Sequence, residues 1–156
     1  ALATASRPDA VGLVAGSGPI RNELEALARK MGAGDRIHFL GHVDQAELSR
    51  LTPRCITLSP LTGMALVECG LGGSPMVAFD RDWQSEFVEE GVNGFVVSFM
   101  DHEAMADRAL RLISDPELRR RMSRAARERA LEFADRDRIE ALERETYERL
   151  LGQRQE

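Results

Sequence analysis

The chain has 156 residues, 43% of them hydrophobic and 30% charged, and its formal net charge is -5. This length suffices for one domain with a hydrophobic core but is short for two, so we expect a single domain over residues 1–156. The acidic balance argues against a nucleic-acid partner, which needs an excess of Lys and Arg. No apolar run approaches the ~20 residues of a membrane-spanning helix, and the first ten residues lack the pattern of a signal peptide.

Cys55 and Cys69 are isolated thiols without C-x-x-C or zinc-ligand spacing. Buried free cysteines in a reducing compartment are the expectation, which makes a cytoplasmic location the default. The chain begins with Ala rather than Met, which we interpret as a processed or excised piece of a longer protein.

Short apolar runs alternate with helical patterns over the first two thirds of the chain. Helices are expected at 20–31 and 84–90, within 59–75, and at 44–51, where Asp44 and Glu47 form a capping-box pattern. The runs predict strands at 11–15, 37–40, 55–58, 75–79 and 94–97. Five such strands separated by helices predict an α/β fold: a Rossmann-like parallel β-sheet with helices on both faces, in three layers.

The last third of the chain is predicted to be helical. Asp101 caps one helix, and Asp115 followed by Pro116 starts another. A final helix is expected at about 138–151. The positions expected to face inward or to align on one side of these helices are Met105, Ala109, Leu112, Ile113, Leu118, Met122, Ala125, Ala126, Phe133, Ile139, Leu142, Thr146 and Leu150.

A ligand site is expected beyond the carboxyl ends of the strands, where parallel sheets bind ligands. The loops at that edge are "GSGP", "GHVD", "SPLTG" and "DRDW". Gly63 precedes the helix after the third strand, and its backbone would let a phosphate approach the helix start. Glu68, five residues on, lies ~7–8 Å along that helix, a separation that suits a diphosphate and the ribose next to it. A helix-edge carboxylate, or one paired with an Arg, remains an alternative on the residues alone.

The segments "LVAGSGPIRNELEALARKMGAGDRIHFLGHV", "LVECGLGGSPMVAFD", "SEFVEEGVNGFVV" and "DPELRRRMSRAARERALEF" together resemble the C-terminal, donor-binding domain of a GT-B glycosyltransferase. The resemblance covers about residues 10–151 and is closest to the large retaining, group 1 family that uses nucleotide-diphosphate sugars. It implies that Glu68 holds the donor ribose. Other donor-binding positions that it implies are Gly63, Met64, Ala65 and Leu66 at the diphosphate, Gly16 and Gly18 near the donor, and Leu40, Gly41 and His42 against the base.

Three departures from the family pattern stand out. Pro60 occupies the place of the family's first glutamate, eight residues before Glu68, so either Thr62 substitutes for it or the sugar is handled differently. Where the family often has a Gly pair, the chain has "DRDWQSE". There Trp83 is either a stacking platform or a lid over the core, and Glu86 matches an acidic position. The family's basic pair, the domain's opening strand and the acceptor-binding domain are expected upstream of residue 1.

Other signals are discounted. Asp80 and Asp82 form a D-x-D pattern, but two carboxylates make a poor Mg²⁺ site, and the resemblance implies a metal-independent reaction without cofactor. The run "RRRMSRAARER" is interpreted as a solvated helix face. Of the three histidines only His42 lies on a candidate ligand loop.

The sequence therefore predicts the donor domain of a retaining glycosyltransferase that takes a UDP-, GDP- or ADP-sugar. The full-length enzyme is expected to act in the cytoplasm, with peripheral contact to the inner face of the membrane, while this chain alone binds nucleotide weakly and transfers nothing. The main alternative is a catalytically silent nucleotide- or sugar-binding module. A GT-B-like phosphorylase or epimerase is a third hypothesis, and Lys30, the sole Lys, does not suit a pyridoxal site.

Overall fold

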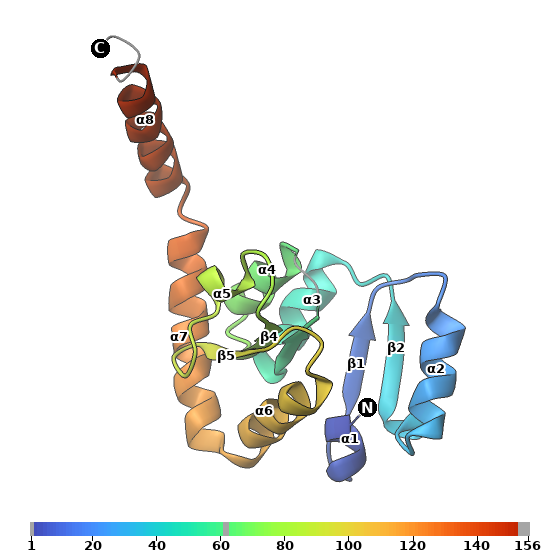
Figure 1. Ribbon diagram of the computed structural model, residues 1–156. Helices are drawn as coiled ribbons and strands as arrows, with labels where there is room; N and C mark the ends of the chain where they lie inside the picture. Colours follow the sequence, from blue (N-terminus) through green and yellow to red (C-terminus); the bar gives the residue numbers. More distant parts are fainter. Residues whose placement is uncertain (1, 61–62, 153–156) are drawn as a thin grey trace.

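The computed structural model describes residues 2–60 and 63–152. In this part, strands and helices alternate up to residue 97 and only helices follow (Figure 1). The strands are β1 (Gly12–Ala15), β2 (Ile37–Gly41), β3 (Thr57–Ser59), β4 (Met76–Phe79) and β5 (Gly94–Val97). All five correspond to predicted strands. Only β3 is displaced, because Cys55 closes a 3-10 turn by donating its N–H to Thr52 O at 3.1 Å, and the strand starts after it.

The helices of the described part are α1 (Leu2–Ser6), α2 (Arg21–Lys30), α3 (Gln45–Leu51), α4 (Ala65–Leu71), α5 (Gln84–Phe87), α6 (His102–Ser114), α7 (Pro116–Phe133) and α8 (Arg136–Gly152), with 3-10 turns at Gly34–Arg36 and Thr52–Arg54. Helix α1 was not predicted. Helix α5 is shorter than predicted because the Asn93 side chain binds the backbone at its end, accepting from Glu89 N and donating to Phe87 O.

The three predicted N-caps are confirmed. Each of the carboxylates of Asp44, Asp101 and Asp115 accepts a hydrogen bond from the backbone N–H of the residue three positions later. The distances are 2.8, 2.8 and 2.9 Å. These bonds satisfy donors that a helix start otherwise leaves without an intrahelical partner. They account for the positions at which α3, α6 and α7 begin.

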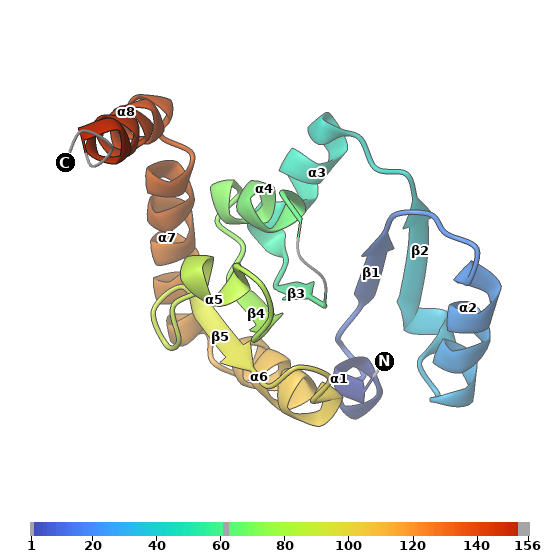
Figure 2. The same cartoon turned by 45° about the horizontal axis from the view of Figure 1, so that its top comes forward.

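The strands form two parallel sheets rather than the single predicted sheet. One sheet pairs β1 with β2, and the other has the order β3-β4-β5. Figure 2 shows β1 and β3 at the neighbouring edges of the two sheets. These two strands are not paired with each other by backbone hydrogen bonds. The α/β, Rossmann-like class is confirmed, but an apolar run predicts a strand and not its pairing partner, so the division into two sheets was not predicted.

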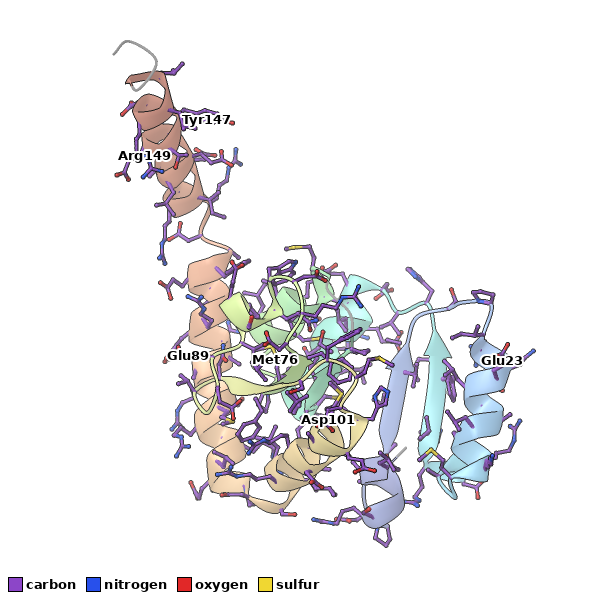
Figure 3. The ribbon with its side chains drawn as sticks, viewed as in Figure 1. Glu23, Met76, Glu89, Asp101, Tyr147 and Arg149 are labelled. Atoms are coloured by element: carbon purple, nitrogen blue, oxygen red, sulfur yellow. The ribbon has the colours of Figure 1, made fainter. Side chains whose placement is uncertain are left out.

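The core surrounds β4, whose side chains alternate between two helical layers. Met76 and Ala78 pack with residues of α4 and α7, including Leu66 and Ala126. On the opposite face the side chains that pack together come from β4, β5, α6 and α7: Val77, Phe79, Phe95, Val97, Met105, Leu112, Leu118 and Met122. Figure 3 shows Met76 in the middle of this packed region. The predicted three layers are therefore present around β4.

Helix α8 continues from the end of α7 away from the sheets (Figure 1). Its aligned apolar residues Ile139, Leu142 and Leu150 are 43%, 53% and 52% exposed. Tyr147 and Arg149 lie far from the rest of the molecule in Figure 3. The helix was predicted correctly, but its apolar face is not buried against any other described element.

Both cysteines are free thiols, with Cys69 buried and Cys55 half-buried. Burial raises the pKa of the Cys55 and Cys69 thiols. Within the described residues, no helix has the length and apolar character needed to cross a membrane.

Candidate functional site

Gly16, directly after β1, and Gly41, the last residue of β2, meet at the carboxyl ends of these strands. Gly16 donates its N–H to Gly41 O at 2.6 Å. Their φ angles are +122° and +73°, values that favour glycine because side chains with a Cβ rarely adopt them. A Cβ built on Gly16 or Gly18 meets no atom within 4 Å. Two segments that were predicted to lie near the donor are thus adjacent, and the Gly16–Gly18 loop borders open space.

The predicted base-binding segment begins within β2 and ends just beyond it. Leu40 and Gly41 are the last residues of the strand, Leu40 is 37% exposed, and His42 is exposed. The Arg21 guanidinium lies beside this segment, because its Nη2 donates to Phe39 O at 2.9 Å. Sequence reasoning did not select Arg21, although it stands two residues after the "GSGP" loop that was singled out.

The predicted diphosphate-binding residues form the start of α4. Gly63 is exposed, and a Cβ there meets nothing within 4 Å. Its carbonyl accepts the Leu66 N–H at 3.1 Å. Met64 is 63% exposed, whereas Leu66 is 2% exposed, so the Leu66 side chain belongs to the core. Thr62, the proposed substitute for the missing glutamate, lies outside the described residues.

Glu68 is half-buried in α4, between the buried residues Val67 and Cys69. Its carboxylate Oε1 accepts a hydrogen bond from Gln45 Nε2 at 3.2 Å. None of the ion pairs found among the described residues includes Glu68. An Arg partner, one of the two alternatives, is therefore absent among the described residues, whereas the other alternative, a carboxylate at a helix edge, stays open. Gln45 was also missed by sequence reasoning, and the only available signal was its place directly after the Asp44 cap.

Trp83 is a lid over the core. Its ring stacks on Phe133 with centroids 5.8 Å apart and meets the edge of Phe87 at 6.3 Å. Of the two interpretations left open for Trp83, this one is confirmed. Glu86 is exposed next to it and accepts a hydrogen bond from Arg129 through its backbone carbonyl. Asp82 has a φ of +52°, and its carboxylate Oδ2 lies 3.4 Å from Arg81 Nε.

Two hollows are found in the described surface, one on α8 and one that includes Arg21 and Phe39. One, of about 350 Å³, is lined by Ile139, Leu142, Glu143, Thr146 and Tyr147 on α8. The other, of about 270 Å³, lies between α2 and β2. Neither is lined by Gly63 or Glu68.

The parallel strands, the covering helices and the glycine loops at the carboxyl edge define a Rossmann-like domain of the GT-B type. The family described as "Glycosyl transferases group 1" matches residues 1–129, and the chain belongs to this family of glycosyltransferases.

Two curated relatives and one solved structure illustrate the similarity. The α-D-kanosaminyltransferase of Streptomyces kanamyceticus is 33% identical over 73% of this chain and 31% of its own length. The N-acetyl-α-D-glucosaminyl L-malate synthase of Bacillus anthracis is 32% identical over 80% of this chain and 33% of its own length. The structure of Anabaena HepE in complex with UDP superposes with a TM-score of 0.81, at 25% identity over 94% of this chain and 43% of that one. The chain thus spans about a third of the length of these curated relatives.

Proposed function

We propose that this chain is the donor-binding domain of a retaining, metal-independent glycosyltransferase that takes its sugar from a nucleotide-diphosphate sugar. The match to the group 1 glycosyltransferases over residues 1–129 is the observation that carries the proposal. The similarity to HepE, whose structure holds UDP, supports a uridine nucleotide as the first donor to test. UDP-, GDP- and ADP-sugars all belong to the proposed donor class.

In this proposal Glu68 accepts hydrogen bonds from the ribose hydroxyls of the donor. Glu68 is half-buried, so part of the residue reaches the surface. Gln45 bonds to Oε1, and Oε2 remains for a hydroxyl. The backbone of Gly63, Met64, Ala65 and Leu66 faces the diphosphate, and by stabilising the charge that develops on this leaving group it would assist the transfer.

The loops after β1 and β2 complete the proposed donor site. Gly16 and Gly18 lie close to the donor in this proposal, and the open space beside them leaves room for it. Leu40, Gly41 and His42 lie against the base. The Gly16–Gly41 hydrogen bond supports this arrangement, since it holds the two segments together.

The remaining parts of the enzyme belong to the longer protein in this proposal. These are the acceptor-binding domain, the basic pair for the diphosphate and the opening strand of the donor domain. No strand of the described residues pairs with the second edge of β1 or of β3, which supports an additional strand at this position. The longer protein is proposed to be cytoplasmic, with its other domain near the inner face of the membrane.

A catalytically silent nucleotide- or sugar-binding module is the second candidate. Pro60, an exposed residue, stands where the family has its first glutamate. A donor site without that carboxylate binds the nucleotide but handles the sugar differently, or not at all. Nucleotide binding is common to both candidates, whereas glycosyl transfer by the full-length protein is expected for the first only.

The test is a titration of the chain with UDP, GDP and ADP, followed through backbone amide shifts. Shifts clustered at Gly16, Gly18, Leu40–His42 and Gly63–Glu68 are expected, and Glu68→Gln should weaken binding about tenfold. Glu23→Gln on the outer side of α2 (Figure 3) is the matched control and should leave binding unchanged.

The absence of localised shifts at millimolar nucleotide would contradict donor binding by this chain. The same titration on a version extended upstream, with the opening strand and the basic pair, then decides whether the whole proposal is wrong.

A further inference from the structure

Gln45 and Glu68 connect two elements that follow different strands. Gln45 is the first residue of α3, just after the proposed base-binding segment. Glu68 lies in the first turn of α4, just after the proposed diphosphate-binding segment. The contact from Gln45 Nε2 to Glu68 Oε1, at 3.2 Å, therefore joins the two helices that follow these segments.

The chemistry of this pair leaves room for a further partner. A carboxylate accepts hydrogen bonds on two oxygens, each with two lone-pair positions, and it donates none when ionised. Gln45 fills one position on Oε1, while its own amide oxygen is a further acceptor. The pair therefore presents at least two acceptors next to each other, which matches the two neighbouring hydroxyls of a ribose.

A glutamate side chain has three rotatable bonds, and fixing it for a ligand costs free energy. A hydrogen bond made before the ligand arrives reduces the cost that remains at binding. Gln45 makes such a bond from an element other than α4. We propose that Gln45 is a positioning residue, which holds the Glu68 carboxylate in the orientation that receives the ribose diol. This assignment rests on the proposed role of Glu68.

Gln45 contributes little to holding α3 in place. Its side chain is exposed, and the start of the helix is fixed by Asp44, whose carboxylate accepts the Glu47 N–H at 2.8 Å. A substitution at Gln45 should therefore change ligand preference without changing the stability of the chain. That separation allows a positioning role to be distinguished from a structural one.

The experiment compares a nucleotide with its 2′,3′-dideoxy form, using whichever of UDP, GDP and ADP binds most tightly. The ratio of the two dissociation constants measures recognition of the diol. Gln45→Met, which keeps the length of the side chain and removes the donor, should lower this ratio about threefold to tenfold. Gln45→Lys restores a donor and should recover most of it, and its added charge acts on both ligands alike.

Two further readouts make the test specific. In the Glu68→Met background, which removes the acceptor of the Gln45 hydrogen bond, Gln45→Met should no longer change the ratio, because the two residues act through one contact. In the ligand-free chain, the scalar couplings that report the Glu68 χ1 angle should change from those of one rotamer to an average in Gln45→Met. Arg50→Met, on the same exposed helix, is the control and should alter neither quantity.

The outcomes separate the two proposals. A ratio that falls in Glu68→Gln but is unchanged in Gln45→Met overturns the positioning role and leaves the proposed function standing. Unchanged Glu68 couplings in Gln45→Met overturn it as well. If the unaltered chain binds the nucleotide and its dideoxy form equally, or binds no nucleotide, the role of Glu68 and the positioning role of Gln45 are both overturned.

Discussion

The two sheets of this molecule have similar strands and very different surroundings. β4 has the sequence MVAF, and all of its residues are buried. β1 has the sequence GLVA, and its last three residues are exposed. Helices cover both faces of β4, whereas few residues of the part before β3 are buried, among them Ala28 and Ala33. The burial of a strand is thus set by the layers around it and not by its own apolar content.

The largest expected difference between the two regions comes from the same substitution in each. Leu112→Ala in α6, at a residue that is 0% exposed, should lower the free energy of unfolding by about 2–5 kcal/mol. Leu27→Ala in α2, where the side chain is 49% exposed, should lower it by less than about 1 kcal/mol. Urea denaturation of the two variants measures both values. Equal losses would show that the region around α2 is packed as tightly as the β4 core.

Glycine-to-alanine changes make the second comparison. A Cβ on Gly94 would lie 2.3 Å from Met76 O, inside the β4–β5 ladder. Gly94→Ala should therefore destabilise the chain by about 1–3 kcal/mol, because backbone must shift. Gly18→Ala meets nothing within 4 Å and should leave the melting temperature almost unchanged. A stable Gly94→Ala variant would mean that β4 and β5 separate easily.

Amide hydrogen exchange should show the same contrast without substitution. The β4 amides are expected to exchange only through global unfolding, and the β1 amides on the order of tenfold faster or more, because few buried contacts hold that sheet. Exchange followed by NMR at several denaturant concentrations distinguishes local from global opening. Equal protection in β1 and β4 would show that the two sheets unfold as one unit.

The smallest expected difference concerns the helix caps. Asp115 caps α7, which packs against the core around β4, and Asp115→Ala should lower the free energy of unfolding by about 1 kcal/mol. Asp44→Ala removes the cap of α3, which has no buried residues. We expect it to lower the free energy of unfolding by only a few tenths of the Asp115→Ala value, because the start of α3 can fray locally without unfolding the rest. Thermal unfolding of both variants, with Asp35→Ala as a surface control, tests the ranking.

Local signals in the sequence were sufficient for the elements and their caps. Asp44, Asp101 and Asp115 cap the expected helices, since a cap depends on residues close in sequence. The separation of β1 from β3 and the core contact of Trp83 with Phe133 were not predictable in this way. Both depend on partners that are distant in sequence, and a periodic pattern carries no information about those partners.

The candidate site shows the same limit. Gly16 and Gly41 were selected from two separate loops, and the hydrogen bond between them emerged only in three dimensions. Gln45 was not selected because nothing in its local sequence marks it, and its contact with Glu68 spans 23 residues of chain. Whether the selected residues bind a donor stays a prediction until a nucleotide is titrated.

The unpaired edge of β1 also affects how the chain associates with other molecules. At the outer side of β5, the Glu90 carboxylate accepts the Val96 N–H at 2.7 Å, and a charged group at an edge discourages a second strand from adding there. β1 (GLVA) contains no charged residue, and its last three residues are exposed. Exposed uncharged edges of this kind recruit extended segments of other molecules. We therefore expect the chain to associate with itself as its concentration is raised, so the NMR titrations should use a dilute sample.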